Sequence, residues 1–176
     1  MKNAYAGHLK YSFQLRPHTV ADQAYIGAYQ GIGVGYFNFG NPEELGNPLA
    51  VYLFQGGRIA QFSPRISLNY EWNFGASFGW KPYDEYDNPE NQIIGSKVNA
   101  YLNVNLYLKW ALSPKFDLMI GATGSHFSNG NTQYPNSGLN TVDCKVGLVY
   151  NFNRRADELA QSWQRPIVPP FPRHVS

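Results

Sequence analysis

Apolar and polar residues alternate with a period of two over several long segments of the chain, and such alternation places one set of side chains on each face of a β-strand. The pattern is clearest over residues 65–81. The even positions there are apolar or aromatic: Ile66, Leu68, Tyr70, Trp72, Phe74, Ala76, Phe78 and Trp80. The odd positions include the polar or charged residues Ser67, Asn69, Glu71, Asn73 and Ser77. This segment is therefore predicted to be a strand with one apolar face and one polar face.

Six further segments follow the same pattern. It is clear in residues 98–110, 116–129 and 141–152. It is weaker in residues 8–15, 25–38 and 49–62. In the first of the clear segments, Tyr101 and Tyr107 share the polar side with Asn and Lys residues. The sequence therefore predicts seven strands.

The length of the clearest strands favours a membrane protein over a soluble β-sandwich. They run to roughly 13–17 residues, whereas strands in globular proteins average about six, and the longer ones can cross a bilayer at a tilt. Charged residues make up only 15% of the chain, against the usual quarter or so of a soluble domain. We therefore expect an all-β fold, an antiparallel transmembrane β-barrel with a polar interior, in which Trp72, Trp80 and Trp110 lie at the membrane interfaces.

The connections between the predicted strands alternate in length, as in barrels that have short periplasmic turns and long extracellular loops. Tight turns are expected at 63–65 and 112–115, and long polar loops at 40–48, 82–96 and 129–137. With this orientation, a closed barrel of eight strands needs one more strand before Tyr5. We therefore expect residues 1–152 to be a barrel whose first strand belongs to a longer protein, and residues 153–176 to be a periplasmic tail.

One predicted strand breaks the apolar rule on its lipid-facing side. Within residues 116–129, the even positions end in His126 and Ser128. Alternate residues of a strand lie about 6–7 Å apart at their Cα atoms, which lets a base reach its nucleophile. If the following hairpin is symmetric, Asn140 lies opposite His126 and accepts the other imidazole N–H. These three residues form a candidate catalytic row; the alternative is that they are ordinary polar residues at the headgroup boundary.

The string SHFSNGNTQYPNSGLN at residues 125–140 resembles the signature of the lipid A 3-O-deacylase family, which also contains acyloxyacyl-hydrolase-like relatives. The match lies in HFSN, PN and GLN, and the resemblance covers the barrel over residues 9–152. It implies that His126 is the general base and Ser128 the nucleophile. Asn140 occupies the place of the third catalytic residue, where the typical family member has Glu.

The neutral Asn140 can orient His126 but brings no charge to stabilise an imidazolium. A Ser-His-Asn set with similar chemistry occurs in another barrel family, the outer-membrane phospholipases A. Asp143 is a poor substitute acid because its parity points it into the barrel. Asn129 and Asn136 match family positions that flank the nucleophile, and we expect their side-chain amides or the loop N–H groups there to stabilise the oxyanion. The alternative is that both residues serve ordinary turn chemistry.

The sequence thus predicts a hydrolase that removes an ester-linked acyl chain from lipid A in the outer leaflet of the Gram-negative outer membrane, with no metal or other cofactor. An outer-membrane phospholipase and a catalytically silent structural or adhesion barrel are the alternatives. The net charge of +2 and the lack of a Lys/Arg cluster argue against a nucleic-acid partner. A homodimer is left open. The single Cys144 excludes an internal disulfide and is read as an apolar residue facing lipid.

Overall fold

The alternating segments pair into one antiparallel sheet of seven strands. The computed structural model describes residues 3–14 and 27–154. The strands are β1 (Tyr5–Gln14), β2 (Tyr29–Asn38), β3 (Gly46–Gln61), β4 (Ile66–Trp80), β5 (Val98–Ala111), β6 (Phe116–Ser128) and β7 (Leu139–Tyr150). Each strand pairs with the next one along the chain. The seven predicted strands are therefore confirmed, with ends that differ by a few residues.

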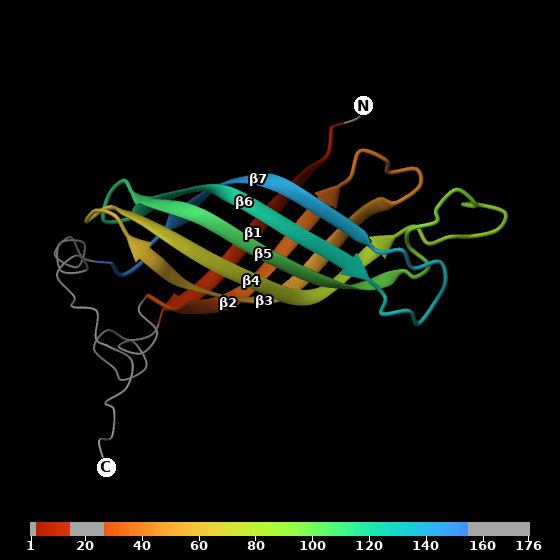
Figure 1. Cartoon of the computed structure of the whole chain (residues 1–176), viewed down its shortest axis with the longest axis horizontal. Coiled ribbons are helices and arrows are strands. Elements are labelled where there is room, and N and C mark those ends of the chain that lie inside the picture. The colour runs from red at the N-terminus through yellow and green to blue at the C-terminus, as the bar shows by residue number, and fades with distance from the viewer. Residues whose placement is uncertain (1–2, 15–26, 155–176) are drawn as a thin grey trace, which may run out of the picture.

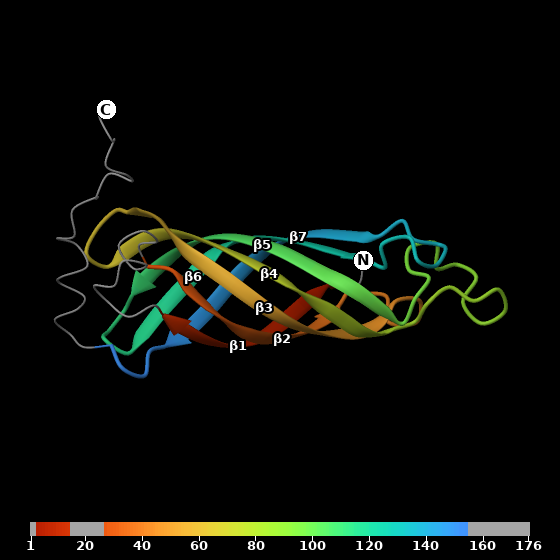
Figure 2. The same ribbon diagram turned by 90° about the horizontal axis from the view of Figure 1, so that it is seen from below.

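The sheet curls on itself into a half-barrel whose strands slant across the long axis (Figures 1 and 2). The long connections after β2, β4 and β6 emerge at one end, and the short turns after β3 and β5 at the other, as predicted (Figure 1). Residues 15–26 of the connection between β1 and β2 lie outside the described residues, as does most of the predicted tail, from residue 155 onward. Within the described part of the chain, no helix has the length and apolar character needed to cross a membrane.

The two faces of the sheet differ as the alternation predicts. Large apolar side chains stand exposed on the outer face, among them Leu53, Phe74, Val104, Leu106, Val146 and Leu148. The interior holds buried polar and tyrosine side chains, among them Asn69, Glu71, Asn99, Asn103, Asn105, Tyr101 and Tyr107. A soluble protein buries its large apolar residues and exposes its charges. An apolar outer face around a polar interior is instead the arrangement of a transmembrane barrel.

A network of charged and polar groups fills the middle of the interior. Glu71 on β4 forms ion pairs with Lys10 on β1 and with Lys145 on β7, the latter at 3.4 Å. The Tyr29 hydroxyl donates to the same carboxylate at 3.1 Å, and the Asn105 amide donates to it at 3.3 Å. Because β1 and β7 are the two edges of the sheet, the ion pairs connect these edges across the interior.

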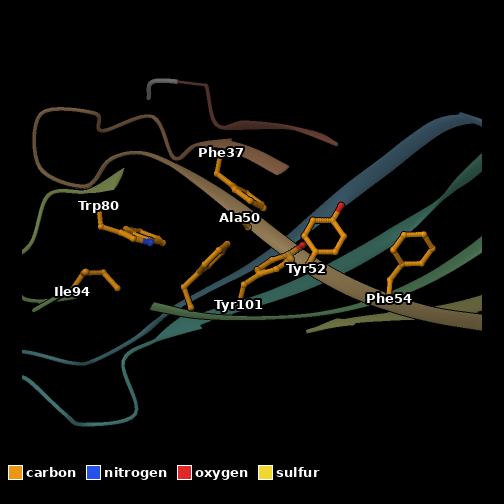
Figure 3. Close-up of a cluster of buried hydrophobic side chains, with 8 residues drawn as sticks. Phe37, Ala50, Tyr52, Phe54, Trp80, Ile94 and Tyr101 are labelled. Atoms are coloured by element: carbon orange, nitrogen blue, oxygen red, sulfur yellow. The ribbon is translucent and has the colours of Figure 1, made fainter. Parts of the chain in front are cut away.

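Aromatic side chains fill the interior at the end that carries the long loops. The buried cluster contains Phe37, Ala50, Tyr52, Phe54, Trp80, Ile94, Tyr101 and Phe127. Figure 3 shows Phe37, Trp80 and Tyr101 reaching into it from different strands. Trp80 is only 3% exposed, so the prediction that it lies at the membrane interface is wrong. Trp72 and Trp110 do lie exposed on the outer face.

An irregularity at the end of β4 turns Trp80 inward. Gly46 pairs with Trp80 and Leu49 with Phe78, so β3 carries one more residue than β4 between these two pairs. Gly79 has a φ of 86°, a conformation that favours glycine. Such a bulge re-aims the side chains beyond it. The indole N–H of Trp80 then donates to the buried Ser77 hydroxyl at 2.9 Å.

Candidate active site on the outer face of β6 and β7

His126 and Ser128 lie side by side at the loop end of β6. Their side chains share the outer face, while Phe127 between them points inward and is 0% exposed. The His126 Nε2 atom lies 3.0 Å from the Ser128 hydroxyl oxygen. Packing of Phe127 in the aromatic cluster therefore fixes the stretch of strand that carries both residues. The separation is that of a hydroxyl donating its proton to a base.

Asn140 on β7 lies directly opposite His126 in the ladder. Its side-chain oxygen is 2.8 Å from Nδ1 of the imidazole. An amide oxygen only accepts, so Nδ1 carries the hydrogen of the neutral ring and donates it to Asn140. Nε2 is then the unprotonated nitrogen, and it faces Ser128. The structure thus brings the three predicted residues together in the order hydroxyl, imidazole and amide.

The surroundings of this row are apolar on the outer face. In the ladder, Leu102 of β5 lies beside His126, and Ala100 lies beside Ser128. His126 and Ser128 are half-buried, and Asn140 is exposed. A hydroxyl, an imidazole and an amide therefore interrupt a surface of hydrocarbon side chains at the end near the long loops.

The predicted oxyanion residues Asn129 and Asn136 also lie close together, in the loop after β6. The backbone N–H of Asn129 donates to the Asn136 side-chain oxygen at 3.1 Å. The Asn129 amide donates to the Gln133 carbonyl at 2.7 Å, and the Asn136 amide to Asn131 at 3.0 Å. These bonds organise the loop and engage its donors, so oxyanion binding by Asn129 and Asn136 stays a prediction.

Sequence reasoning assigned no role to Gly138, which lies against the imidazole. A Cβ atom built on Gly138 would stand 3.2 Å from Cε1 of His126. The residue belongs to the GLN triplet that carries the family resemblance, and this was its only signal in the sequence. Asp143 is paired opposite Thr123 and accepts a hydrogen bond from the Thr141 hydroxyl at 2.8 Å. Among the described residues, Asp143 forms no hydrogen bond or ion pair with His126, consistent with the prediction that it does not replace the acid.

The end of β4 and the loops after β2 and β4 also border an open hollow of about 440 Å³. It is lined by Glu43, Trp80, Lys81, Pro82, Asp84, Asp87, Asn88 and Lys97. The backbone N–H groups of Asp87 and Tyr86 donate to the Asp84 carboxylate and lower its pKa. Within residues 3–14 and 27–154, no three His, Cys, Asp or Glu side chains are grouped so that they could hold a metal ion. The Ser-His-Asn row contributes no residue to this hollow.

A family model described as lipid A 3-O-deacylase (PagL) matches residues 5–149. No curated protein and no solved structure matches the chain. The matched span begins with β1 and reaches into β7, so it includes the loop after β6 and all three residues of the row. Since the match covers most of the sequence, the chain belongs to the lipid A 3-O-deacylase (PagL) family.

Proposed function

We propose that the protein is an outer-membrane esterase that removes an ester-linked acyl chain from lipid A. The observation that carries this proposal is the hydrogen-bonded row on the outer face, with His126 3.0 Å from Ser128 and 2.8 Å from Asn140. Membership in a family of lipid A deacylases supplies the substrate class. The position of the row on an apolar surface suits a substrate that arrives sideways through the membrane.

The reaction runs in two steps. Nε2 of His126 takes the Ser128 proton as the hydroxyl oxygen attacks the ester carbonyl carbon, and the tetrahedral intermediate collapses as His126 returns the proton to the sugar oxygen. An acyl-enzyme on Ser128 remains. A water molecule then attacks the acyl carbon with His126 again as the base. This attack forms a second tetrahedral intermediate. Its collapse releases the fatty acid as His126 returns the proton to the Ser128 oxygen, and neither step needs a metal.

Asn140 has a narrower role than a carboxylate would have. It fixes the tautomer by accepting the Nδ1 hydrogen, so that Nε2 is available as a base. It does not stabilise the imidazolium by charge, because an amide is neutral. The proposed site therefore keeps the hydrogen-bonded geometry of a catalytic triad but lacks the negative charge of the third residue.

Mass spectrometry of lipid A tests the proposal. The full-length protein would be expressed in a Gram-negative host, and we expect lipid A that has lost the mass of one acyl chain. Ser128→Ala and His126→Ala should each lower the rate by about 10²-fold or more, because general base catalysis alone contributes that much. Ser113→Ala, in the turn at the opposite end of the sheet, is the matched control and should behave as the wild type.

Two other outcomes would overturn the assignment. If the wild-type protein is folded and present in the outer membrane but lipid A is unchanged, the protein is a catalytically silent structural or adhesion barrel. Release of fatty acid from glycerophospholipids with lipid A intact would identify a phospholipase. Both classes of lipid are measured in the same membrane extract, so the experiment separates the three functions.

A further inference from the structure

We propose that Gly138 is a positioning residue for His126 and that the loop between β4 and β5 holds it in place. This inference rests on the proposed function, because it concerns the same imidazole. It adds a second segment of the chain to the site, one that contributes no side chain to the reaction.

Gly138 stands against the edge of the ring that lies between its two nitrogens. A Cβ atom at this position would be 3.2 Å from Cε1 of His126 and 3.7 Å from Cβ of Ser128. The Cε1 atom separates Nδ1 from Nε2, so a push on it tilts the ring and disturbs the bonds to Asn140 and Ser128 together. The φ of Gly138 is 70°, which an L side chain rarely adopts. Only glycine gives both the space and the backbone conformation.

The backbone of the β4–β5 loop is hydrogen-bonded to Gly138 and its neighbour. The Gly138 N–H donates to the Ile93 carbonyl at 3.3 Å. The neighbouring Ser137 hydroxyl donates to the Gln92 carbonyl at 3.1 Å. A Cβ atom built on Gly95 would lie 2.6 Å from the Pro135 carbonyl oxygen, so the two loops meet backbone to backbone. The position of Gly138 therefore depends on a loop more than 40 residues earlier in the chain.

The β4–β5 loop is itself fixed by the buried Asn91. Its side-chain oxygen accepts the N–H groups of Ile93 and Ile94, each at 3.0 Å. Its amide donates to the Lys81 carbonyl at 2.7 Å. The buried Ile94 belongs to the same aromatic cluster as Phe127. The segment that bonds Gly138 and the strand that carries His126 are thus packed on one core.

This arrangement supports the ring through the whole reaction. His126 becomes an imidazolium after it takes the Ser128 proton, and the neutral Asn140 gives it one hydrogen bond but no opposite charge, so the packing around the ring also helps to hold it in place. Phe127 fixes its strand from the inside, and Gly138 limits its movement on the outside. A misplacement of about 1 Å can cost roughly a hundredfold in rate, so a smaller displacement is expected to be measurable.

The chain offers a matched control for this contact. Gly130 lies in the same loop with a φ of 65°, and a Cβ atom built on it meets nothing within 4 Å. Gly138→Ala and Gly130→Ala therefore impose similar backbone strain, and only the first presses on the imidazole. We expect Gly138→Ala to lower kcat about ten- to hundredfold with KM within about twofold, and Gly130→Ala to change kcat by less than about threefold.

A third variant separates the effect of backbone strain at position 138 from the effect of the contact with the imidazole. Gly138→Asn relieves part of the strain, because Asn tolerates positive φ, but it still introduces a Cβ atom. We expect kcat to remain low in Gly138→Asn. The rate at which a fluorophosphonate labels Ser128 should fall in both variants at position 138, and the band shift between heated and unheated samples on gels would verify that each barrel is folded.

The outcomes distinguish this inference from the proposed function. If Gly138→Ala, folded, is as active as Gly130→Ala while Ser128→Ala is inactive, Gly138 does not position the ring and the proposed function stands. Recovery of activity in Gly138→Asn would also overturn the inference, because strain alone would then explain the loss. Activity in Ser128→Ala would instead overturn the proposed function.

Discussion

Asn140 gives His126 a hydrogen-bond acceptor without a charge. The 2.8 Å contact holds the tautomer that leaves Nε2 facing Ser128. A neutral hydrogen bond contributes about 0.5–1.5 kcal/mol net, whereas a hydrogen bond to a charged group contributes about 1.5–3 kcal/mol. The residue therefore limits the rate of the proposed reaction more than it limits the type of reaction.

Two substitutions at Asn140 test this interpretation. Asn140→Ala should lower kcat by roughly two- to tenfold, because one neutral hydrogen bond is lost. Asn140→Glu should retain or raise kcat, since a carboxylate adds an opposite charge beside the imidazolium that forms when His126 takes the Ser128 proton. Steady-state hydrolysis of purified lipid A measures both. Complete loss of activity in Asn140→Glu would contradict the assigned place of Asn140.

At the scale of the elements, the outer faces of β4, β5 and β6 form one surface. Val104 is 64% exposed there, and its ladder neighbours Trp72 and Gly124 share its face. Its chain neighbours Asn103 and Asn105 are buried inside. If this face lies in hydrocarbon, the row of His126 and Ser128 lies at its border.

A charge introduced at Val104 tests where this face lies. Arginine near the middle of a bilayer costs about 2–4 kcal/mol on the lipid face of a barrel. We expect Val104→Arg to lower the free energy of unfolding in lipid vesicles by that amount, measured by denaturant titration. Tyr86→Arg, in the exposed β4–β5 loop, should have almost no effect. Equal effects of the two substitutions would place the outer face of β5 outside the hydrocarbon.

At the scale of the whole molecule, the two edges of the sheet run in the same direction. Each strand is antiparallel to the next, so β1 and β7 are parallel. An antiparallel barrel closes with an even number of strands. A predicted eighth strand would fit between these edges, and it stays a prediction. Across the interior, Lys10 and Lys145 meet at Glu71 and join the same two edges.

Removal of this carboxylate should destabilise the barrel. Glu71 has a side chain only 3% exposed, and Glu71→Gln leaves the ammonium groups of Lys10 and Lys145 close together without an anion. Loss of one partner of a buried ion pair costs about 3–5 kcal/mol. Unfolding by urea in vesicles would measure the difference from Glu85→Gln, an exposed loop residue. Similar stabilities of the two variants would show that the ion pairs do not hold the edges together.

The sequence by itself determined the strands, their two faces and the candidate row. Period-two alternation is a local property of an extended backbone, so parity along β6 was enough to place His126 and Ser128 together. A symmetric hairpin then predicted that Asn140 would lie opposite His126, and the ladder has this pairing. Parity failed at Trp80, because a bulge changes the direction of a side chain and leaves no mark in the alternation.

Only the tertiary structure decided which distant segments meet. Lys10 and Lys145 lie 61 and 74 residues from Glu71, and their contact depends on how far the sheet curls. The contact of Gly138 with Ile93 likewise depends on the way that two loops fold over one core. Strand periodicity describes neighbours along one chain segment and on one ladder. Contacts across the interior and between loops follow from packing in three dimensions, for which a single sequence carries no regular pattern.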